Sequence, residues 1–353
     1  TLGNRQATWY YFRMDNVRER DLTITLTGYL PGEYNDRPAP HMSAEPLPVF
    51  SHDGEHWQHV PAHEWDNEKK EGRFTLKAKT DSLWLALVPP YTHTRLVRLL
   101  GEIAATPHTR VETVGRSVQG RELQIVTVTD FAKPDADKKT VWLQARDHAW
   151  ESPTSFIMEG ALKFIVSDDP AARALRETTI FVFTPMVDPD GCALGRVRFN
   201  GNGWDLNRHW DNVDLRDPMW LQRLPEVWYF KKAIRDYVGS GRKIALMINL
   251  HNTISEYMSA RAPKPTDAPR LQRLFDLLVA DTQFDPARPF QVRPWSGGRS
   301  EGANKPWWVD YDVPMALIET RIAPGKKLKG SPTAEHRLAF GRELLVAMAE
   351  SVK

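Results

Sequence analysis

The chain has 353 residues, of which 41% are hydrophobic and 26% charged, and its formal net charge is only +2. Dispersed, balanced charge argues against nucleic-acid binding, and no apolar run approaches the roughly 20 residues that span a bilayer. Cys192 is the single cysteine, which excludes a disulfide framework and a cysteine-rich zinc site. We expect a soluble protein, either cytoplasmic or exported with a processed amino terminus, and its oligomeric state stays open.

The first ninety residues have the pattern of β-strands. They alternate in polarity and are rich in β-branched and aromatic residues. Strands are predicted at 8–14, 21–30, 73–80 and 83–88, and a hairpin turning at Asp53-Gly54 is predicted over 49–60. Helical periodicity is almost absent. The pattern predicts a small antiparallel β-sandwich domain over residues 1–93.

From the proline pair at 89–90 onward, strands alternate with helices. A helix is predicted at 95–103. Further strands are predicted at 122–130, 140–146, 179–186, 243–250 and 315–320, and further helices at 153–166, 223–238, 268–283 and 334–351. This alternation predicts an α/β catalytic domain over residues 94–353, with a mixed, largely parallel sheet flanked by helices.

Three of these strands lead into side chains suited to metal or proton chemistry. The strand at 140–146 is followed by Asp147, His148 and Glu151, the strand at 243–250 is followed by His251, and the strand at 315–320 carries Glu319. Ligands of open α/β sheets bind beyond the carboxyl ends of the strands. We therefore expect these groups to meet at one edge of the sheet.

Two histidines and a glutamate form one of the sets that hold catalytic zinc and leave a position for water. His148, Glu151 and His251 supply this set. Zinc lowers the pKa of water toward ~7 and polarises a carbonyl, so a separate carboxylate must accept and pass on the proton. Glu319, alone at the end of an apolar strand, is the candidate for that role.

A glycine-bounded segment at 195–210, "GRVRFNGNGWDLNRHW", holds Arg196, Arg198, Asn207 and Arg208. Arginine presents a planar fork that fits a carboxylate and stays charged at any relevant pH. Arginines beside a zinc site indicate an anionic substrate end and a developing oxyanion. Each motif alone is weak, but together and in this order they favour a metal-dependent hydrolase.

The runs "GRSVQGREL", "DHAWES", "PMVDPDGCALGRVRFNGNGWDLNRHW", "INLH" and "ALIET" resemble those of the zinc metallocarboxypeptidases. The segments "ATWYYFRM", "VFSHDGEHW" and "PPYTHTRL" resemble the cytosolic carboxypeptidase-like branch, which carries a small β-sandwich ahead of the catalytic domain. The resemblance covers nearly the whole chain, and the ordered set of motifs is far more specific than any one of them.

The resemblance implies a role for each matching position. His148, Glu151 and His251 match the three ligands of a single zinc ion, and Glu319 matches the general acid/base. Arg198 matches the arginine that polarises the scissile carbonyl, Asn207 and Arg208 match the pair that grips the substrate carboxylate, and Asp205 matches the carboxylate that orients the first histidine.

One feature of the family has no secure counterpart. Many members place a tyrosine before the catalytic glutamate, where it closes over the substrate. The segment 296–313 offers Tyr311, with Trp295 and Trp307 nearby. This segment shapes the side-chain pocket in the family, so the preferred substrate residue is left open.

The predicted function is zinc-dependent hydrolysis of the C-terminal peptide bond of peptides or proteins, with one zinc ion per chain and neither nucleic acid nor a membrane as partner. An N-acyl amino acid deacylase or an esterase on the same fold is an alternative. A second alternative is a catalytically silent binding protein that uses the sandwich or its tryptophan-rich surfaces; the intact ligand set and Glu319 argue against it.

Overall fold

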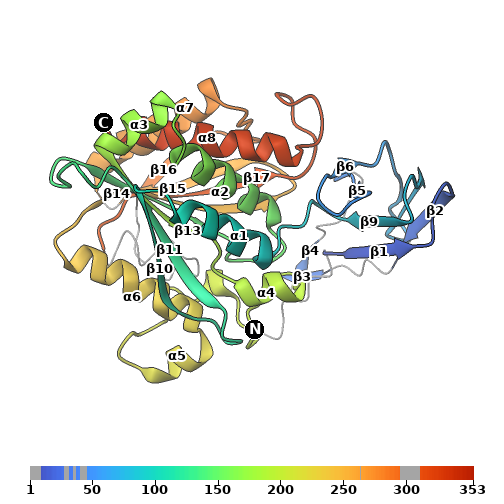
Figure 1. Ribbon diagram of the computed structural model, residues 1–353, viewed down its shortest axis with the longest axis horizontal. Coiled ribbons are helices and arrows are strands. Elements are labelled where there is room, and N and C mark those ends of the chain that lie inside the picture. Colours follow the sequence, from blue (N-terminus) through green and yellow to red (C-terminus); the bar gives the residue numbers. More distant parts are fainter. Residues whose placement is uncertain (1–8, 28–31, 35–36, 40–45, 263, 295–310) are drawn as a thin grey trace.

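The computed structural model describes residues 9–27, 32–34, 37–39, 46–262, 264–294 and 311–353. Antiparallel strands form the amino-terminal part, which lies to the right in Figure 1. The remainder is a single large sheet covered by helices. The predicted fold class is confirmed for both parts.

The amino-terminal strands form two facing sheets and a short extra ribbon. One sheet has the order β1 (Tyr11–Asp15), β9 (Ser82–Ala86), β5 (Val49–Ser51), β6 (Gln58–His59). The other sheet has the order β2 (Asp21–Leu26), β8 (Glu71–Lys77), β7 (Glu64–Asp66). The ribbon consists of β3 (Gly32–Tyr34) paired with β4 (Arg37–Ala39). All these pairs are antiparallel. Phe74 and Leu76 of β8 pack against Leu83 and Leu85 of β9, so alternate side chains of the two sheets fill a shared core.

The large sheet has eight strands among the described residues. Their order is β10 (Thr109–Arg116), β11 (Glu122–Val128), β13 (Thr179–Thr184), β12 (Lys139–Ala145), β14 (Ile244–Thr253), β17 (Met315–Arg321), β15 (Tyr257–Ala262), β16 (Val292–Pro294). The four central strands, β13, β12, β14 and β17, are parallel, whereas β10, β11 and β15 join their neighbours toward the centre antiparallel. The central strands are therefore the ones whose carboxyl ends share one edge.

Helices cover both faces of this sheet. They are α1 (His93–Ala104), α2 (Ser152–Ile165), α3 (Pro170–Thr178), α4 (Pro189–Leu194), α5 (Pro218–Arg223), α6 (Pro225–Gly239), α7 (Ala268–Asp281) and α8 (Ala334–Ser351), with 3-10 turns η1 (Leu206–Arg208) and η2 (Pro265–Asp267). The apolar sides of α1, α2, α3, α7 and α8 share one core with the sheet, and α6 packs into a second core on the opposite face (Figure 1). The central strands are thus buried on both faces, as their continuous apolar sequences predict.

Most predicted elements are present, with differences at the exposed margins. Strand β10 was not predicted, because it lies at the sheet edge and its residues alternate only weakly in burial. The helix predicted over 223–238 begins at Pro225, after the shorter helix α5. Strand β14 continues through Thr253, so His251 lies inside the strand and not beyond its end.

The two parts of the chain meet around the segment that follows β9. Leu87 and Val88 pack with Trp150 and Ile322 in a small apolar cluster. His59 also reaches across, with one ring nitrogen 3.1 Å from the carbonyl oxygen of Pro332. The domain boundary near residue 93, at the start of α1, is retained as our proposal.

Candidate zinc centre

A tight turn after β12 presents the first two candidate ligands. Arg146 has a positive φ of 65°, which an L-residue rarely adopts. Its buried guanidinium donates to the carbonyl oxygen of Ala149 at 2.6 Å and to the hydroxyl of Ser155 at 2.9 Å, and these bonds hold the turn. His148 then points inward, and Glu151 directly precedes α2.

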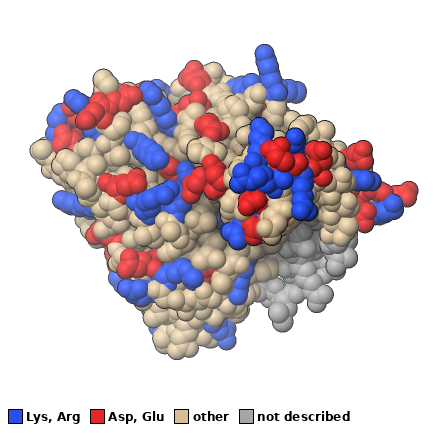
Figure 2. Space-filling view, turned by 45° about the vertical axis from the view of Figure 1, so that its right-hand side comes forward, with Lys and Arg blue, Asp and Glu red and all other residues tan. Residues whose placement is uncertain are grey.

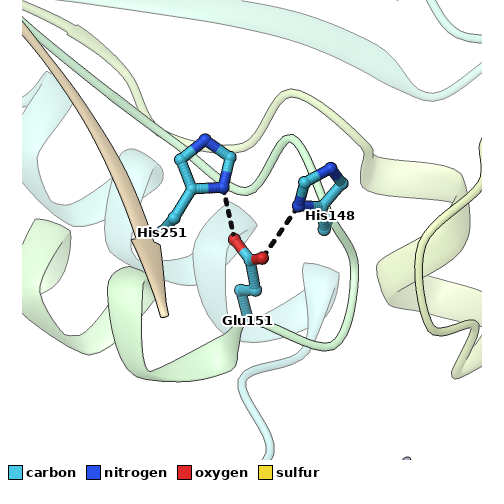
Figure 3. A group of neighbouring side chains, drawn as sticks. All are labelled: His148, Glu151 and His251. Carbon is cyan, nitrogen blue, oxygen red and sulfur yellow. Dashed lines mark hydrogen bonds and ion pairs between the residues drawn. The ribbon is translucent and has the colours of Figure 1, made fainter. Parts of the chain in front are cut away.

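The third candidate, His251, comes from β14 and meets the other two (Figure 3). The Nδ1 atom of His148 is 2.8 Å from one carboxylate oxygen of Glu151, and the Nδ1 atom of His251 is 2.9 Å from the other. Ligand atoms of all three residues lie within 4.8 Å of one another, and all three side chains are buried. The structure therefore brings together the three residues that the sequence predicted as zinc ligands.

The charges of this group suit a divalent cation. Burial and Arg198 disfavour protonation of His148, but Glu151 and Asp205 outweigh them and raise its pKa to about 9. Burial likewise opposes ionisation of Glu151, but the two histidines lower its pKa to about 2. Two imidazole nitrogens and a carboxylate, buried and close to one another, are the nitrogen and oxygen donors that zinc prefers, so the residues fit this metal.

Asp205 supports the first histidine from behind. Its fully buried carboxylate is 3.2 Å from Nε2 of His148 and accepts a hydrogen bond of 2.6 Å from Nε of Arg198. Burial favours the neutral acid, but His148 and Arg198 hold its pKa well below the usual range. An ionised carboxylate at this position fixes the ring and its proton on Nε2, which leaves Nδ1 for the metal.

The turn η1 places the predicted substrate-gripping residues next to this group. The Asp205 carboxylate accepts from the backbone N–H of Asn207 at 3.0 Å and so caps the turn. The side-chain nitrogen of Asn207 is 3.2 Å from Nε2 of His251. The guanidinium of Arg208 donates to the carbonyl oxygen of Asn207 at 2.8 Å. Asn207 thus touches the ligand group, and Arg208 is held beside Asn207.

Glu319 occupies a position adjacent to His251 on the neighbouring strand. The register of β14 and β17 sets the two residues directly opposite each other, so their side chains share one face of the sheet. Burial, tempered by His251, raises the pKa of Glu319 to about 7. Among the described residues, one of its carboxylate oxygens is buried without a hydrogen-bond partner. A carboxylate with this pKa can accept and return a proton near neutrality.

Two further residues of the site were assigned no role from sequence. Asp147 lies behind His251, with a carboxylate oxygen 3.7 Å from Nε2 of that ring. Tyr257 lies opposite Glu319 on β15. Burial and the Glu319 carboxylate raise the pKa of Tyr257 to about 12, and the guanidinium of Arg288 lies 3.7 Å from its ring centre.

The sequence offered one indication for Asp147, which is its position next to His148. It offered none for Tyr257, because only the order of the strands places that residue beside Glu319. Tyr311 is half-buried and packs against the core that the apolar side chains of α6 share. Trp295 and Trp307 lie outside the described residues.

Charged residues of both signs are intermixed over the face shown in Figure 2, where no continuous basic band is visible. Over the described ranges, no helix is both long enough and apolar enough to cross a membrane.

Comparison with known proteins gives concordant matches for both parts of the chain. The family model described as zinc carboxypeptidase matches residues 96–276, and that of the cytosolic carboxypeptidase N-terminal domain matches residues 3–87. Cytosolic carboxypeptidase 6 of Mus musculus is 31% identical over 220 residues, which are 60% of this chain and 41% of the mouse protein. The chain thus spans less than half the length of this relative.

Solved structures show the same fold. A putative carboxypeptidase from Burkholderia mallei is similar with a TM-score of 0.83 at 24% identity, over 99% of this chain and 88% of that one. A metallo-carboxypeptidase from Burkholderia cenocepacia has a TM-score of 0.83 at 22% identity, over 99% and 92%. The first family model covers more than half of the sequence and includes all three candidate ligands. The chain belongs to the zinc carboxypeptidase family.

Proposed function

We propose that the protein is a zinc-dependent metallocarboxypeptidase that hydrolyses the C-terminal peptide bond of peptides or proteins, with one zinc ion per chain. The observation that carries this proposal is the convergence of His148, Glu151 and His251, with Glu319 directly opposite His251 in the sheet register. Family membership supports the same reaction class.

The ligand residues define the chemistry that the site can supply. His148, Glu151 and His251 would hold the zinc ion, and the chemistry that it would supply is Lewis acidity, which polarises a carbonyl and lowers the pKa of water toward neutrality. The burial of all three side chains strengthens their electrostatic interactions.

The remaining residues of the site bind the substrate or transfer protons. Arg208 and the side-chain amide of Asn207 hold the free carboxylate of the substrate, which places the last peptide bond over the site. Arg198, fixed by Asp205, donates to the scissile carbonyl oxygen as negative charge develops there. Glu319 accepts a proton from the attacking water and returns it to the departing amine, a role supported by its pKa of about 7.

Two other functions are less well supported. An N-acyl amino acid deacylase would use the same metal set and the same two carboxylate-binding residues, Asn207 and Arg208, because its substrate also ends in a free carboxylate. An esterase that acts on a neutral ester would not require these two residues. A silent binding protein would not require Glu319 and three mutually facing ligand residues. Neither is favoured by a specific observation of the site.

The proposal is tested with purified protein loaded with zinc and a peptide library that differs only in the last residue. We expect release of single C-terminal residues, measured by mass spectrometry, and no release from the same peptides carrying a C-terminal amide. The amide is the matched control, because it removes only the charge that Arg208 would bind. Hydrolysis of N-acyl amino acids in preference to every peptide would support the deacylase instead.

A further inference from the structure

Asp147 places a buried carboxyl group next to the site, and the roles assigned so far leave it unused. Its side chain is fully buried, and its oxygens accept from the side-chain amide of Gln144 at 3.1 Å and 3.3 Å and from the indole N–H of Trp210 at 3.3 Å. Both donors are neutral. Within the described part of the chain, no lysine or arginine pairs with this carboxylate, and a buried charge without a cationic partner is costly.

The nearest ligand residue to this carboxylate is the second histidine of the site. The distance between an Asp147 oxygen and Nε2 of His251 is 3.7 Å, which is too long for a hydrogen bond but short for an electrostatic contact. The opposite ring nitrogen, Nδ1, faces the carboxylate of Glu151 at 2.9 Å. The ring therefore presents one nitrogen to the ligand group and the other to Asp147.

A closer form of this arrangement exists around the first histidine. Nδ1 of His148 faces Glu151, and its Nε2 faces the carboxylate of Asp205 at 3.2 Å. Each imidazole thus lies between the shared glutamate in front and an aspartate behind. The two aspartates come from different loops, one directly before His148 and one at the start of η1.

We propose that Asp147 is a positioning residue for the metal site, because its charge favours the tautomer of His251 that carries the proton on Nε2 and keeps Nδ1 free to bind zinc. This inference rests on the proposed zinc-dependent function.

One competing arrangement involves Asn207 itself. Its side-chain nitrogen is 3.2 Å from Nε2 of His251. A protonated Nε2 cannot accept from that nitrogen, so the proposed tautomer requires the amide rotated by 180°, which places its oxygen there as a second proton acceptor. If that oxygen alone selects the tautomer, Asp147 serves only to join Gln144 and Trp210. The two arrangements predict different variants with weakened zinc binding.

The test measures the zinc dissociation constant of the full chain by competition with a chromophoric chelator. We expect Asp147→Asn to weaken zinc binding about 10- to 100-fold, as does Asp205→Asn, the equivalent change behind His148. Asp147→Glu, which keeps the charge, should restore most of the affinity. Glu226→Gln is the matched control for a change at a buried carboxyl group. Glu226 accepts hydrogen bonds from Val118 and Asn200, and neither of these is a proposed zinc ligand. The zinc affinity of this variant should be unchanged.

A second readout separates metal positioning from a structural role. The absorption spectrum of the cobalt-loaded protein should shift in Asp147→Asn and not in Glu226→Gln, because only the former alters the ligand environment. Unchanged zinc affinity in Asp147→Asn overturns the inference. So does the result in which Asn207→Leu loses zinc affinity and Asp147→Asn does not. The zinc-binding assays do not depend on turnover. Absence of peptidase activity in the wild-type protein would therefore contradict the proposed function without affecting the measured role of Asp147 in zinc binding.

Discussion

At the scale of single residues, the site depends on a row of side chains that crosses three strands. His251, Glu319 and Tyr257 occupy directly opposed positions on β14, β17 and β15, so all three project from the same face of the sheet. Burial disfavours the charged form of Glu319, whereas His251 favours it, and the balance gives a pKa near neutrality. The strand pairing thus fixes both the position and the proton affinity of the proposed base.

Replacement of this base should separate catalysis from metal binding. In Glu319→Gln, the side chain keeps its shape but cannot accept a proton, so we expect kcat to fall by about 10²- to 10⁴-fold. Zinc content should stay at the wild-type level, because Glu319 is not one of the three proposed ligands. The measurements are peptide hydrolysis and elemental analysis of the same preparation. A variant with kcat within threefold of wild type would remove Glu319 from the mechanism.

At the scale of elements, the helix that begins next to Glu151 is packed unusually closely against the carboxyl-terminal helix. A Cβ atom on Gly160 of α2 would lie 2.0 Å from the carbonyl oxygen of Leu338 on α8. Gly341 of α8 is equally confined, because a Cβ atom added to it would lie 2.0 Å from the carbonyl oxygen of Ile157. Both contacts involve backbone, which cannot move aside cheaply, so the two glycines fix how α2 lies on α8.

Adding a methyl group at this contact should loosen the helix pair and the site together. We expect Gly160→Ala to lower the free energy of unfolding by about 1–3 kcal/mol, measured by urea denaturation, and to weaken zinc binding because α2 follows Glu151 directly. Gly101→Ala in α1 is the control, since no atom lies within 4 Å of its added methyl group. That change should stabilise the chain by about 0.4–1 kcal/mol. Equal stability of both variants would contradict the close packing.

The extent to which sequence predicted these elements follows from burial. The central strands were predictable because both their faces are apolar, and the segments that hold His148, Glu151 and His251 are short and close to those strands. Strand β10 has an exposed edge and therefore no strong periodic pattern. The place of Tyr257 depends on β15 returning antiparallel beside β17, and such long-range pairing is not encoded in local spacing.

At the scale of the whole molecule, the proposed metal joins segments that are far apart in the chain. Two ligands follow β12 and the third lies about one hundred positions further on, in β14. Trp150, between the first two, packs with Leu87 and Val88 from the end of the sandwich, so the ligand turn is supported by both parts of the chain. Metal binding is therefore expected to stabilise the fold as a unit.

Removal of zinc should accordingly lower the thermal stability of the entire chain. With free zinc at 100 times its dissociation constant, binding to the native state adds roughly 2.7 kcal/mol, so a chelator should lower Tm by several degrees. Differential scanning calorimetry with and without chelator measures this shift, and adding excess zinc back is the control. A chelated sample that melts at the same temperature would show that the three residues do not hold a metal in the native state.

The pairing of His251 with Glu319 also limits how related sequences can differ in length. Successive residues of a strand face opposite sides of the sheet, so inserting or deleting one residue within β14 or β17 would turn one member of the pair away from the other. Insertions in functional relatives should therefore fall between the strands, for example between Thr253 and Tyr257 or between Pro294 and Met315. Variation in substrate preference can then accumulate in those connections while the reacting groups stay in place.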